Sequence, residues 1–367
     1  MTDKHNTTII ISSNQINQRF DRFLRKYFRS NPEIKLKDIY TWIRKWYIKC
    51  NGQKKSENYI LKLWDKIIFD DKVVSSISSD INWSYRINIS GDQKIQNLMN
   101  KRWYKFDDLI IYEDKHRIVF NKPTDIVIHS GNKHMDDITM NDLLDYHLDI
   151  KSNISNRNKY GKDMILVNKE TFTPSYWYRL DKDTSGVLIW AKDYETLQYL
   201  NEIIRNKTNI NKYYVAMVSG KLHEKKFDIN LPLFKWYNAK YGRAQSFVNF
   251  EKWLPSKTSI KLLQTIDDDI LGPISLVRCQ IHTGKMHQIR VHLSHIWHPI
   301  LWDIMYWDEF INRKLYKKYK INRQLLHSRK YELTDQNNKK LSFQAPVPDD
   351  FRKFNFDTTI LEWDLYT

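Results

Sequence analysis

The chain has 367 residues, 41% of them hydrophobic, which predicts two domains, or one large domain with an appendage, around a sizeable core. Its 60 Lys and Arg against 43 Asp and Glu give a net charge of +17, which favours nucleic acid as the partner, although a drift towards Lys and Asn raises the charge as well. Two cysteines exclude a disulfide framework and fit a reducing cytoplasm, and neither a membrane span nor a signal peptide is recognisable.

The first predicted domain covers residues 17–72 and follows a stretch, residues 1–16, that we expect to be disordered. The segments "NQRFDRFLRKYF" and "LKDIYTWIRK" each place apolar side chains on one helical stripe beside basic residues. The segment "WYIKCNGQKK" then reads as a strand that enters an Asn-Gly hairpin turn. The pattern predicts a small α+β unit.

Residues 73–105 are polar and rich in Ser and Asn, which is typical of a linker. Residues 106–367 form the second predicted domain, in which strands dominate. Expected strands include "LIIYED", "RIVFNK", "GVLIWAKD", "NKYYVAMVSG" and "ISLVRCQIHTG", and expected helices are "YETLQYLNEIIRN" and "KMHQIRVHLSHI". Strand runs with scattered helices predict an α+β fold with a mainly antiparallel sheet.

The segment "YWYRLDKDTSGVLIWAK" places Asp181 between Arg179 and Lys182, before a Thr-Ser-Gly turn and a buried strand. A carboxylate at such a loop edge can face a cleft, where nearby cations keep it ionised for nucleophilic or general-base work. From the local residues alone, ordinary turn chemistry is the favoured interpretation.

The same segment resembles the central motif of RluA-type pseudouridine synthases, which reads His-Arg-Leu-Asp, two variable residues, Thr-Ser-Gly and a strand that ends in Ala-Lys. Tyr178 stands where the family usually has His, a change that we expect to affect support of the loop and not the chemistry. The matching residues here are Arg179, Leu180, Asp181, Thr184, Ser185, Gly186, Ala191 and Lys192.

Further family motifs follow in order between Asp108 and Phe351. "NKPTDIVIHSG" resembles the first motif, with Asp125 at a typical Gly position, and "NKYYVAMVSGKL" resembles a later one that contains the family's tyrosine, here Tyr214. "IHTGKMHQIRVHLSHIWHPIL" resembles the last. The N-terminal unit, in turn, resembles a small RNA-binding domain shared by a small-subunit ribosomal protein and many RNA-modifying enzymes.

The resemblance implies a pseudouridine synthase catalytic domain with flanking helices behind a small N-terminal α+β RNA-binding domain. Such an enzyme breaks the C1′–N1 bond of a uridine and rejoins the base through C5. It implies Asp181 as the catalytic carboxylate, Arg290 as its ion-pair partner and Tyr214 as a ring that packs on the uracil. The substrate-binding candidates are Lys122, Arg179, Leu180, Lys212, Lys285, His287 and Gln288.

Because the reaction involves no redox step or phosphate transfer, we expect no metal, no nucleotide and no other cofactor. Five histidines fall within residues 282–298, but no Cys pair or His-Glu-x-x-His spacing accompanies them, so a zinc site is not favoured. The expected partner of this cytoplasmic monomer is RNA, with large-subunit ribosomal RNA favoured. A transfer-RNA substrate and a non-catalytic RNA-binding or ribosome-assembly factor remain as alternatives.

The 13 tryptophans are many and the 9 glycines few for a chain of this length. Several Trp stand at helix ends or turns where a residue with positive φ, usually Gly, is expected. In some bacterial lineages UGA encodes glycine, so we hypothesise that some of these Trp are glycines in the native protein. RNA-stacking rings are the alternative. The positions concerned are Trp46, Trp64, Trp297, Trp302 and Trp307.

Overall fold

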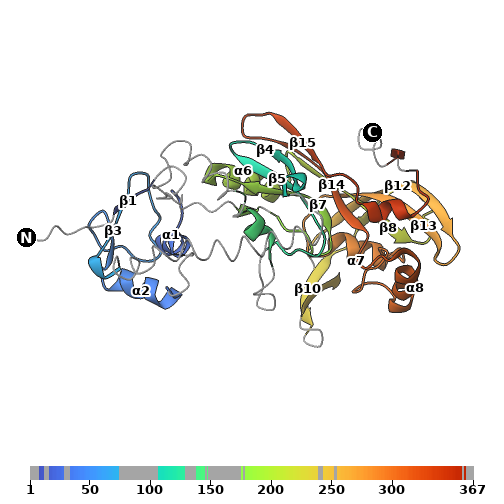
Figure 1. Cartoon of the computed structure of the whole chain (residues 1–367), viewed down its shortest axis with the longest axis horizontal. Coiled ribbons are helices and arrows are strands. Elements are labelled where there is room, and N and C mark those ends of the chain that lie inside the picture. The colour runs from blue at the N-terminus through green and yellow to red at the C-terminus, as the bar shows by residue number, and fades with distance from the viewer. Residues whose placement is uncertain are drawn as a thin grey trace, which may run out of the picture. The chain divides into compact units, whose positions relative to one another are not determined.

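The structure is a computed structural model of the whole chain, and the chain divides into two compact units, one built mainly from residues before 105 and the other mainly from residues after it (Figure 1). Each unit is considered by itself. The structure describes residues 8–11, 16–28, 34–73, 106–128, 138–144, 147, 175–176, 178–238, 243–251, 254–357 and 359–360.

The first unit contains two helices and a three-stranded sheet. The elements are β1 (Thr8–Ile10), α1 (Phe20–Tyr27), α2 (Leu36–Arg44), β2 (Ile48–Cys50) and β3 (Lys66–Phe69), and the strand order is β1-β3-β2. Apolar side chains from both helices and the sheet form one core, with Phe20, Phe23 and Phe69 fully buried. The small α+β unit that the sequence predicts is therefore present.

Two local predictions for this unit have different outcomes. The Asn-Gly turn is confirmed, because Asn51 and Gly52 both have positive φ and Cys50 exchanges backbone hydrogen bonds with Gln53. The expectation that residues 1–16 are disordered is wrong for Thr8–Ile10, which pairs with β3 along an antiparallel register. A three-residue edge strand has too few residues for its alternation to stand out in the sequence.

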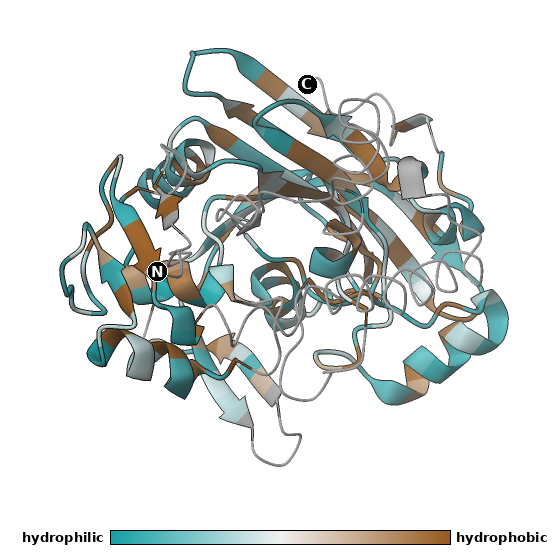
Figure 2. Cartoon of the chain, turned by 60° about the vertical axis from the view of Figure 1, so that its left-hand side comes forward, coloured by the Kyte–Doolittle hydropathy of each residue, from teal (hydrophilic) through white to brown (hydrophobic). Residues whose placement is uncertain are grey.

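The second unit is built on a ten-stranded sheet, and a separate two-stranded ribbon consists of β10 (Leu233–Asn238) and β11 (Arg243–Val248). Its strands carry long hydrophobic stretches, whereas the connecting loops are largely hydrophilic (Figure 2). The sheet strands are β4 (Ile110–Glu113), β5 (Arg117–Lys122), β6 (Ser175–Tyr176), β7 (Ser185–Ala191), β8 (Ile210–Ser219), β9 (Lys226–Asn230), β12 (Lys257–Asp268), β13 (Gly272–Ile281), β14 (Leu326–Thr334) and β15 (Lys340–Gln344).

The helices of this unit are α6 (Tyr194–Asn206), α7 (Gln288–His295) and α8 (Glu309–Tyr319), with 3-10 turns at Phe106–Leu109 and Asp349–Lys353. The bounds of α6 match its predicted segment. Helix α7 begins at Gln288, three residues after the start of the segment predicted for it. Most strand pairs are antiparallel, so the predicted α+β class is confirmed. Two predicted features lie outside the described part of the chain: residues 74–105 of the expected linker, and His129, the histidine of the motif "NKPTDIVIHSG".

Strands β7 and β14 run parallel, and Gly186 is the point of closest approach. Gly186 has φ +112, and a Cβ built there would lie 2.1 Å from the backbone oxygen of Ser328. Only glycine fits such a contact. Strand β7, which follows the Thr-Ser-Gly turn, thus lies in close backbone contact with β14.

Trp46 and Trp297 end helices α2 and α7 in the same way. Each occupies the first position after the C-cap, with φ +63 and φ +65 respectively. The Tyr47 amide donates to Trp42 and the His298 amide to Leu293, which is the six-to-one bond of a Schellman motif. That position is normally glycine, because a Cβ is strained there.

Trp64 and Trp302 occupy four-residue turns at the third position, with φ +70 and φ +61. The Asp65 amide donates to Lys62 and the Asp303 amide to Ile300, as in a turn that requires positive φ at this place. Four of the five predicted glycine-like positions are therefore confirmed. The prediction of a positive φ is wrong for the fifth residue, Trp307, which is absent from the positive-φ residues and packs partly buried against the core.

Candidate active site

Asp181 lies in the loop between Leu180, which is buried, and strand β7. Its backbone oxygen accepts a hydrogen bond from the Thr184 amide at 3.1 Å, which closes the turn. The side chain of Asp181 is 28% exposed, whereas Thr184 and the strand behind it are buried. The turn therefore presents one carboxylate at the edge of a packed sheet.

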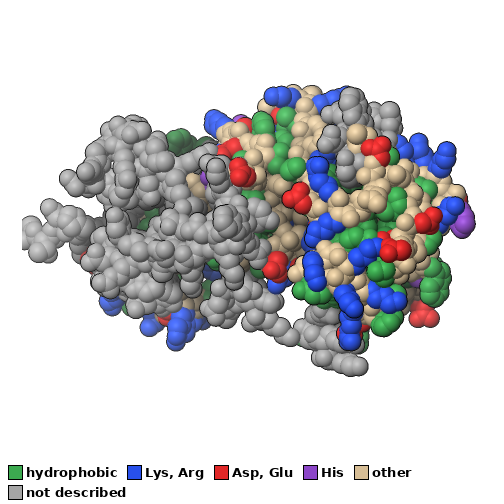
Figure 3. All heavy atoms as spheres, turned by 45° about the vertical axis from the view of Figure 1, so that its right-hand side comes forward, with side chains coloured by type: hydrophobic (Ala, Val, Ile, Leu, Met, Phe, Trp, Pro, Cys, Tyr) green, Lys and Arg blue, Asp and Glu red, His purple; other side chains and the backbone are tan. Residues whose placement is uncertain are grey.

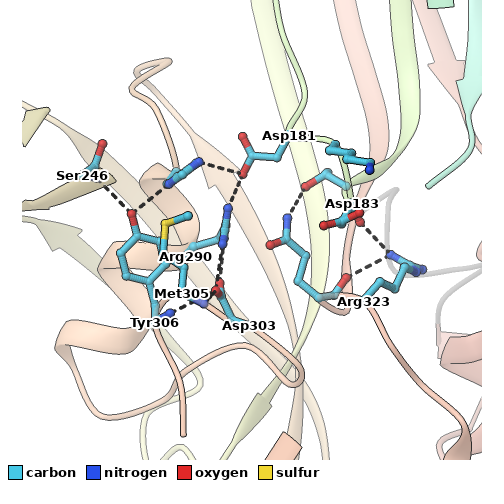
Figure 4. Close-up of polar contacts among 12 residues, drawn as sticks. Asp181, Asp183, Ser246, Arg290, Asp303, Met305, Tyr306 and Arg323 are labelled. Atoms are coloured by element: carbon cyan, nitrogen blue, oxygen red, sulfur yellow. Dashed lines mark hydrogen bonds and ion pairs between the residues drawn. The ribbon is translucent and has the colours of Figure 1, made fainter. Parts of the chain in front are cut away.

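Arg290 is the ion-pair partner of Asp181, as predicted. Its Nη1 donates to Oδ2 of Asp181 at 2.8 Å, although 109 residues separate the two (Figure 4). Arg290 is buried on α7 between Ile289 and Val291, so its side chain is held firmly at the end of the sheet. Charge-assisted hydrogen bonds of this kind are strong and fix the geometry of both partners.

The surroundings of Asp181 favour its ionised form. Burial of the Asp181 carboxyl raises its pKa, but the positive charges of His287 and Arg290 and hydrogen bonds from Arg290 and Gln324 outweigh this effect. The pKa of Asp181 therefore lies below its ordinary value. Asp181 is a carboxylate over the whole physiological range, which a nucleophile or a general base requires.

Tyr214 lies on β8 and is 5% exposed. Its hydroxyl is 3.0 Å from the hydroxyl of Tyr331, which is fully buried on β14. Burial raises the pKa of Tyr214 to about 12, so the phenol is neutral near pH 7. A neutral phenol can donate a proton and can pack on an uncharged base, which leaves the predicted role open.

Lys122 is bound by the protein's own backbone, and its predicted contact with substrate stays a prediction. The side chain is fully buried, and Nζ donates to three backbone oxygens, those of Pro123 at 2.9 Å, Lys182 at 2.7 Å and Thr184 at 3.0 Å. All three hydrogens of the ammonium group are thereby used. Lys122 instead ties the 182–184 turn beside Asp181 to the end of β5.

Gln288 likewise makes hydrogen bonds within the protein, and its predicted contact with substrate stays a prediction. It is buried, its Oε1 accepts from Thr283 Oγ1 and from the Lys285 amide, and its Nε2 donates to the backbone oxygen of Lys257 and to Thr258. A glutamine with these contacts has little capacity left for RNA. Gln288, the first residue of α7, thus supports the 283–285 loop, whereas other residues of the same motif face Asp181.

His287 is on the side that faces Asp181. It adopts a left-handed conformation with φ +55 at the start of α7, and its Nε2 lies 3.7 Å from Oδ2 of Asp181. The sequence predicted contact with substrate, which no contact here tests. The structure adds a contact with the carboxylate itself.

The remaining candidates differ in exposure. Arg179 is exposed, Lys285 is half-buried and Lys212 is 7% exposed. Burial lowers the pKa of Lys212 to about 8. Contact of these residues with RNA stays a prediction.

Among the five histidines of residues 282–298, His292 has a structural role. His292 is fully buried, and its ring nitrogens contact Ser256 at 3.0 Å and Thr258 at 2.9 Å. Burial lowers the pKa of His292 to about 4. Over the described residues, no cluster of three or more His, Cys, Asp or Glu could hold a metal ion, and no helix is long and apolar enough to cross a membrane.

Comparison with known proteins gives the family. The family model described as RNA pseudouridylate synthase matches residues 116–295. The ribosomal large subunit pseudouridine synthase C of Buchnera aphidicola from Acyrthosiphon pisum is 31% identical over 350 residues, which cover 94% of this chain and 95% of the relative. The chain belongs to the RluA-type RNA pseudouridine synthases. Its substrate class is therefore RNA.

Two other RNA pseudouridine synthases are similar. An uncharacterised RNA pseudouridine synthase of Mycoplasma capricolum is 30% identical over 302 residues and covers 82% of this chain and 85% of its own length. The ribosomal large subunit pseudouridine synthase D of Borreliella burgdorferi is 38% identical over 204 residues, or 54% of each chain.

Several residues of this synthase site were not predicted from the sequence. Asp303, Tyr306, Gln324 and Tyr331 all contact a predicted site residue or its turn. Asp303 directly follows the positive-φ position at Trp302, so the turn signal pointed to this segment without giving its role.

Proposed function

We propose that this synthase isomerises specific uridines of large-subunit ribosomal RNA to pseudouridine. The observation that carries the proposal is the buried Arg290 that holds the Asp181 carboxylate at 2.8 Å, at positions that match the family's motifs. The name of the Buchnera relative, similar over nearly the whole chain, supports ribosomal RNA as the substrate. Transfer RNA is the main alternative.

The chemistry follows from the charge state of the site. Asp181 is ionised and partly exposed, so it can attack or assist at the ribose or the base while the C1′–N1 bond breaks. The freed uracil then turns, C1′ bonds to C5, C5 loses its hydrogen and N1 gains one. Tyr214, neutral beside this site, is the proposed ring that packs on the base and can move the final proton. No step consumes a cofactor.

Basic surfaces support binding of a polyanion. On the face of the catalytic unit in Figure 3, Lys and Arg side chains are spread over the surface among hydrophobic ones. The first unit carries basic residues in the last turns of α1 and α2, such as Lys26 and Arg44, and we propose that it binds RNA too. Such contacts offset the few kcal/mol needed to extrude a stacked uridine, and they weaken as salt rises.

Mapping pseudouridines in ribosomal and transfer RNA tests this function. Cells that carry the wild-type gene, a deletion or Asp181→Asn should differ at particular uridines of the large-subunit RNA, and both mutants should lack them. Asp193→Asn, a change between the C-terminal end of β7 and the start of α6, is the matched control and should keep every site. Persistence of all sites in the Asp181→Asn strain contradicts the catalytic role, and loss only in transfer RNA reassigns the substrate.

A cytoplasmic, cofactor-free monomer completes the proposal. Purified protein, dialysed against a chelator, should convert a large-subunit transcript at an undiminished rate and elute as one chain in size-exclusion chromatography. A non-catalytic ribosome-assembly factor is the second candidate, and it predicts no conversion by purified protein.

A further inference from the structure

One turn, Asp303 to Tyr306, contacts both side chains that flank Asp181 (Figure 4). Asp303 is 1% exposed, and its two oxygens face Arg290. Oδ2 accepts from Nε at 2.7 Å and Oδ1 accepts from Nη2 at 2.8 Å. A two-point contact with a planar guanidinium fixes its rotation as well as its position. It leaves Nη1 as the nitrogen that reaches Asp181.

Tyr306, at the other end of the turn, holds His287. The Tyr306 hydroxyl accepts a hydrogen bond from the Ser246 amide at 3.0 Å and lies 2.8 Å from Nδ1 of His287. This contact fixes the orientation of the imidazole ring, whichever of the two atoms is the donor. The other ring nitrogen, Nε2, then faces Asp181.

Arg290 and His287 meet at one oxygen of the carboxylate. Nη1 of Arg290 lies 2.8 Å from Oδ2 of Asp181 and Nε2 of His287 lies 3.7 Å from the same atom. The two groups therefore converge on a single oxygen of the Asp181 carboxylate and fix its orientation.

The turn couples its two ends through the Asp303 carboxylate. Oδ1 of Asp303 also accepts from the backbone amides of Met305 at 3.0 Å and Tyr306 at 3.1 Å. The ring of Tyr306 lies under the Arg290 guanidinium, 5.1 Å from Cζ. Ser294 of α7 donates to the backbone oxygen of Tyr306 at 2.8 Å, which ties the turn back to the helix.

We propose that Asp303 and Tyr306 are positioning residues that set Arg290 and His287 against Oδ2 of Asp181. This inference rests on the proposed function. Both residues act through Arg290 and His287, so changes at them should alter kcat and leave the KM for RNA unchanged.

A double-mutant cycle on the full-length protein tests the inference. Tyr306→Phe keeps the ring and removes the hydroxyl, and it should lower kcat about 10-fold, as expected for one lost hydrogen bond to an active-site group. Because the hydroxyl acts through His287, Tyr306→Phe should cost nothing further in a His287→Ala background. A general structural role predicts additive losses instead. Tyr112→Phe, which removes a half-buried hydroxyl bonded to Asp114, is the control and should keep kcat.

Asp303→Asn probes the other half of the turn. It should lower kcat about 100-fold through misplacement of Arg290, with RNA affinity retained. If this variant unfolds, the Tyr306 cycle still decides. Additive losses in an active enzyme, or a rise in KM alone, overturn the positioning roles. A wild-type chain that converts no uridine in either RNA overturns the proposed function and this inference with it.

Discussion

The ring of Tyr331 stacks on the ring of Tyr178, with centroids 4.7 Å apart and an interplanar angle of 16°. Tyr178 is the residue that replaces the family's usual His, and its hydroxyl donates to the backbone oxygen of Val187 at 2.5 Å. This agrees with the expectation that the substitution alters support of the loop. The same stack places the Tyr331 hydroxyl 3.0 Å from that of Tyr214.

Tyr331→Phe should therefore impair Tyr214 without removing it. The stack with Tyr178 survives, but the Tyr214 hydroxyl loses its hydrogen bond with Tyr331, so we expect kcat to fall about 10-fold and stability to fall by about 1 kcal/mol. Single-turnover kinetics and urea unfolding measure the two effects. Tyr199→Phe, which removes a hydroxyl bonded to Thr334, is the control. Equal losses of kcat in both variants would contradict the link to Tyr214.

Lys122→Met tests whether Lys122 stabilises the 182–184 turn or binds RNA. Removal of the ammonium group leaves three inward-facing backbone oxygens without their donor, so the free energy of unfolding should fall by about 3 kcal/mol or more. Activity should fall with it, because the 182–184 turn loosens. Urea unfolding and RNA-binding titrations are the measurements. A variant of normal stability with weak RNA binding would support the prediction of a phosphate contact.

Lys212 predicts a pH dependence on the alkaline side. Its pKa is lowered to about 8, so its positive charge is present below that pH and is lost as the pH rises through it. If Lys212 binds a phosphate, the KM for RNA should rise about 10-fold between pH 7 and pH 9. Lys212→Arg, which stays charged, should abolish that rise, whereas Lys225→Arg at an exposed position should not. An unchanged profile in Lys212→Arg would argue against a phosphate contact.

Glycine should relieve backbone strain at positions 46, 64, 297 and 302. A side chain in the left-handed region costs about 1 kcal/mol or more, so Trp→Gly at the exposed positions 46, 64 and 297 should stabilise the protein by about that amount. At position 302 the loss of the ring's packing against the core should offset this gain. Trp190→Gly, at a fully buried position in β7, should destabilise it by several kcal/mol. Thermal unfolding of the five variants gives the comparison.

The gene and the native protein give a second test of the same prediction. UGA codons at these four positions and a native mass that fits glycine would establish the reassignment, while UGG codons would disprove it. Trp297 is 89% exposed and sits behind the Arg290 helix, so its ring contributes no packing that glycine would lose.

Features that depend on local sequence patterns or on the order of the family motifs could be predicted from the sequence. The bounds of α6, the Asn-Gly turn and the pairing of Asp181 with Arg290 all follow from such signals. The hydrogen bonds of Lys122 were not predicted, because they go to carbonyl groups of Lys182 and Thr184, 60 and 62 residues away, which no local pattern reveals. Asp303 and Tyr306 were missed for the same reason, since their partners are identified only when the chain is folded.

The close contact of β7 and β14 at Gly186 bears on when the enzyme becomes active during its synthesis. The catalytic turn leads directly into β7, yet this strand pairs with His327 and Ser328, more than 140 residues later. While β14 of a nascent chain is still inside the ribosome, β7 lacks the strand that holds the Thr184–Gly186 turn in place. A contact of such long sequence separation also carries a high loop-closure entropy, so it is slow to form. Catalysis is thus reserved for nearly finished chains, and products truncated before residue 326 should be inert.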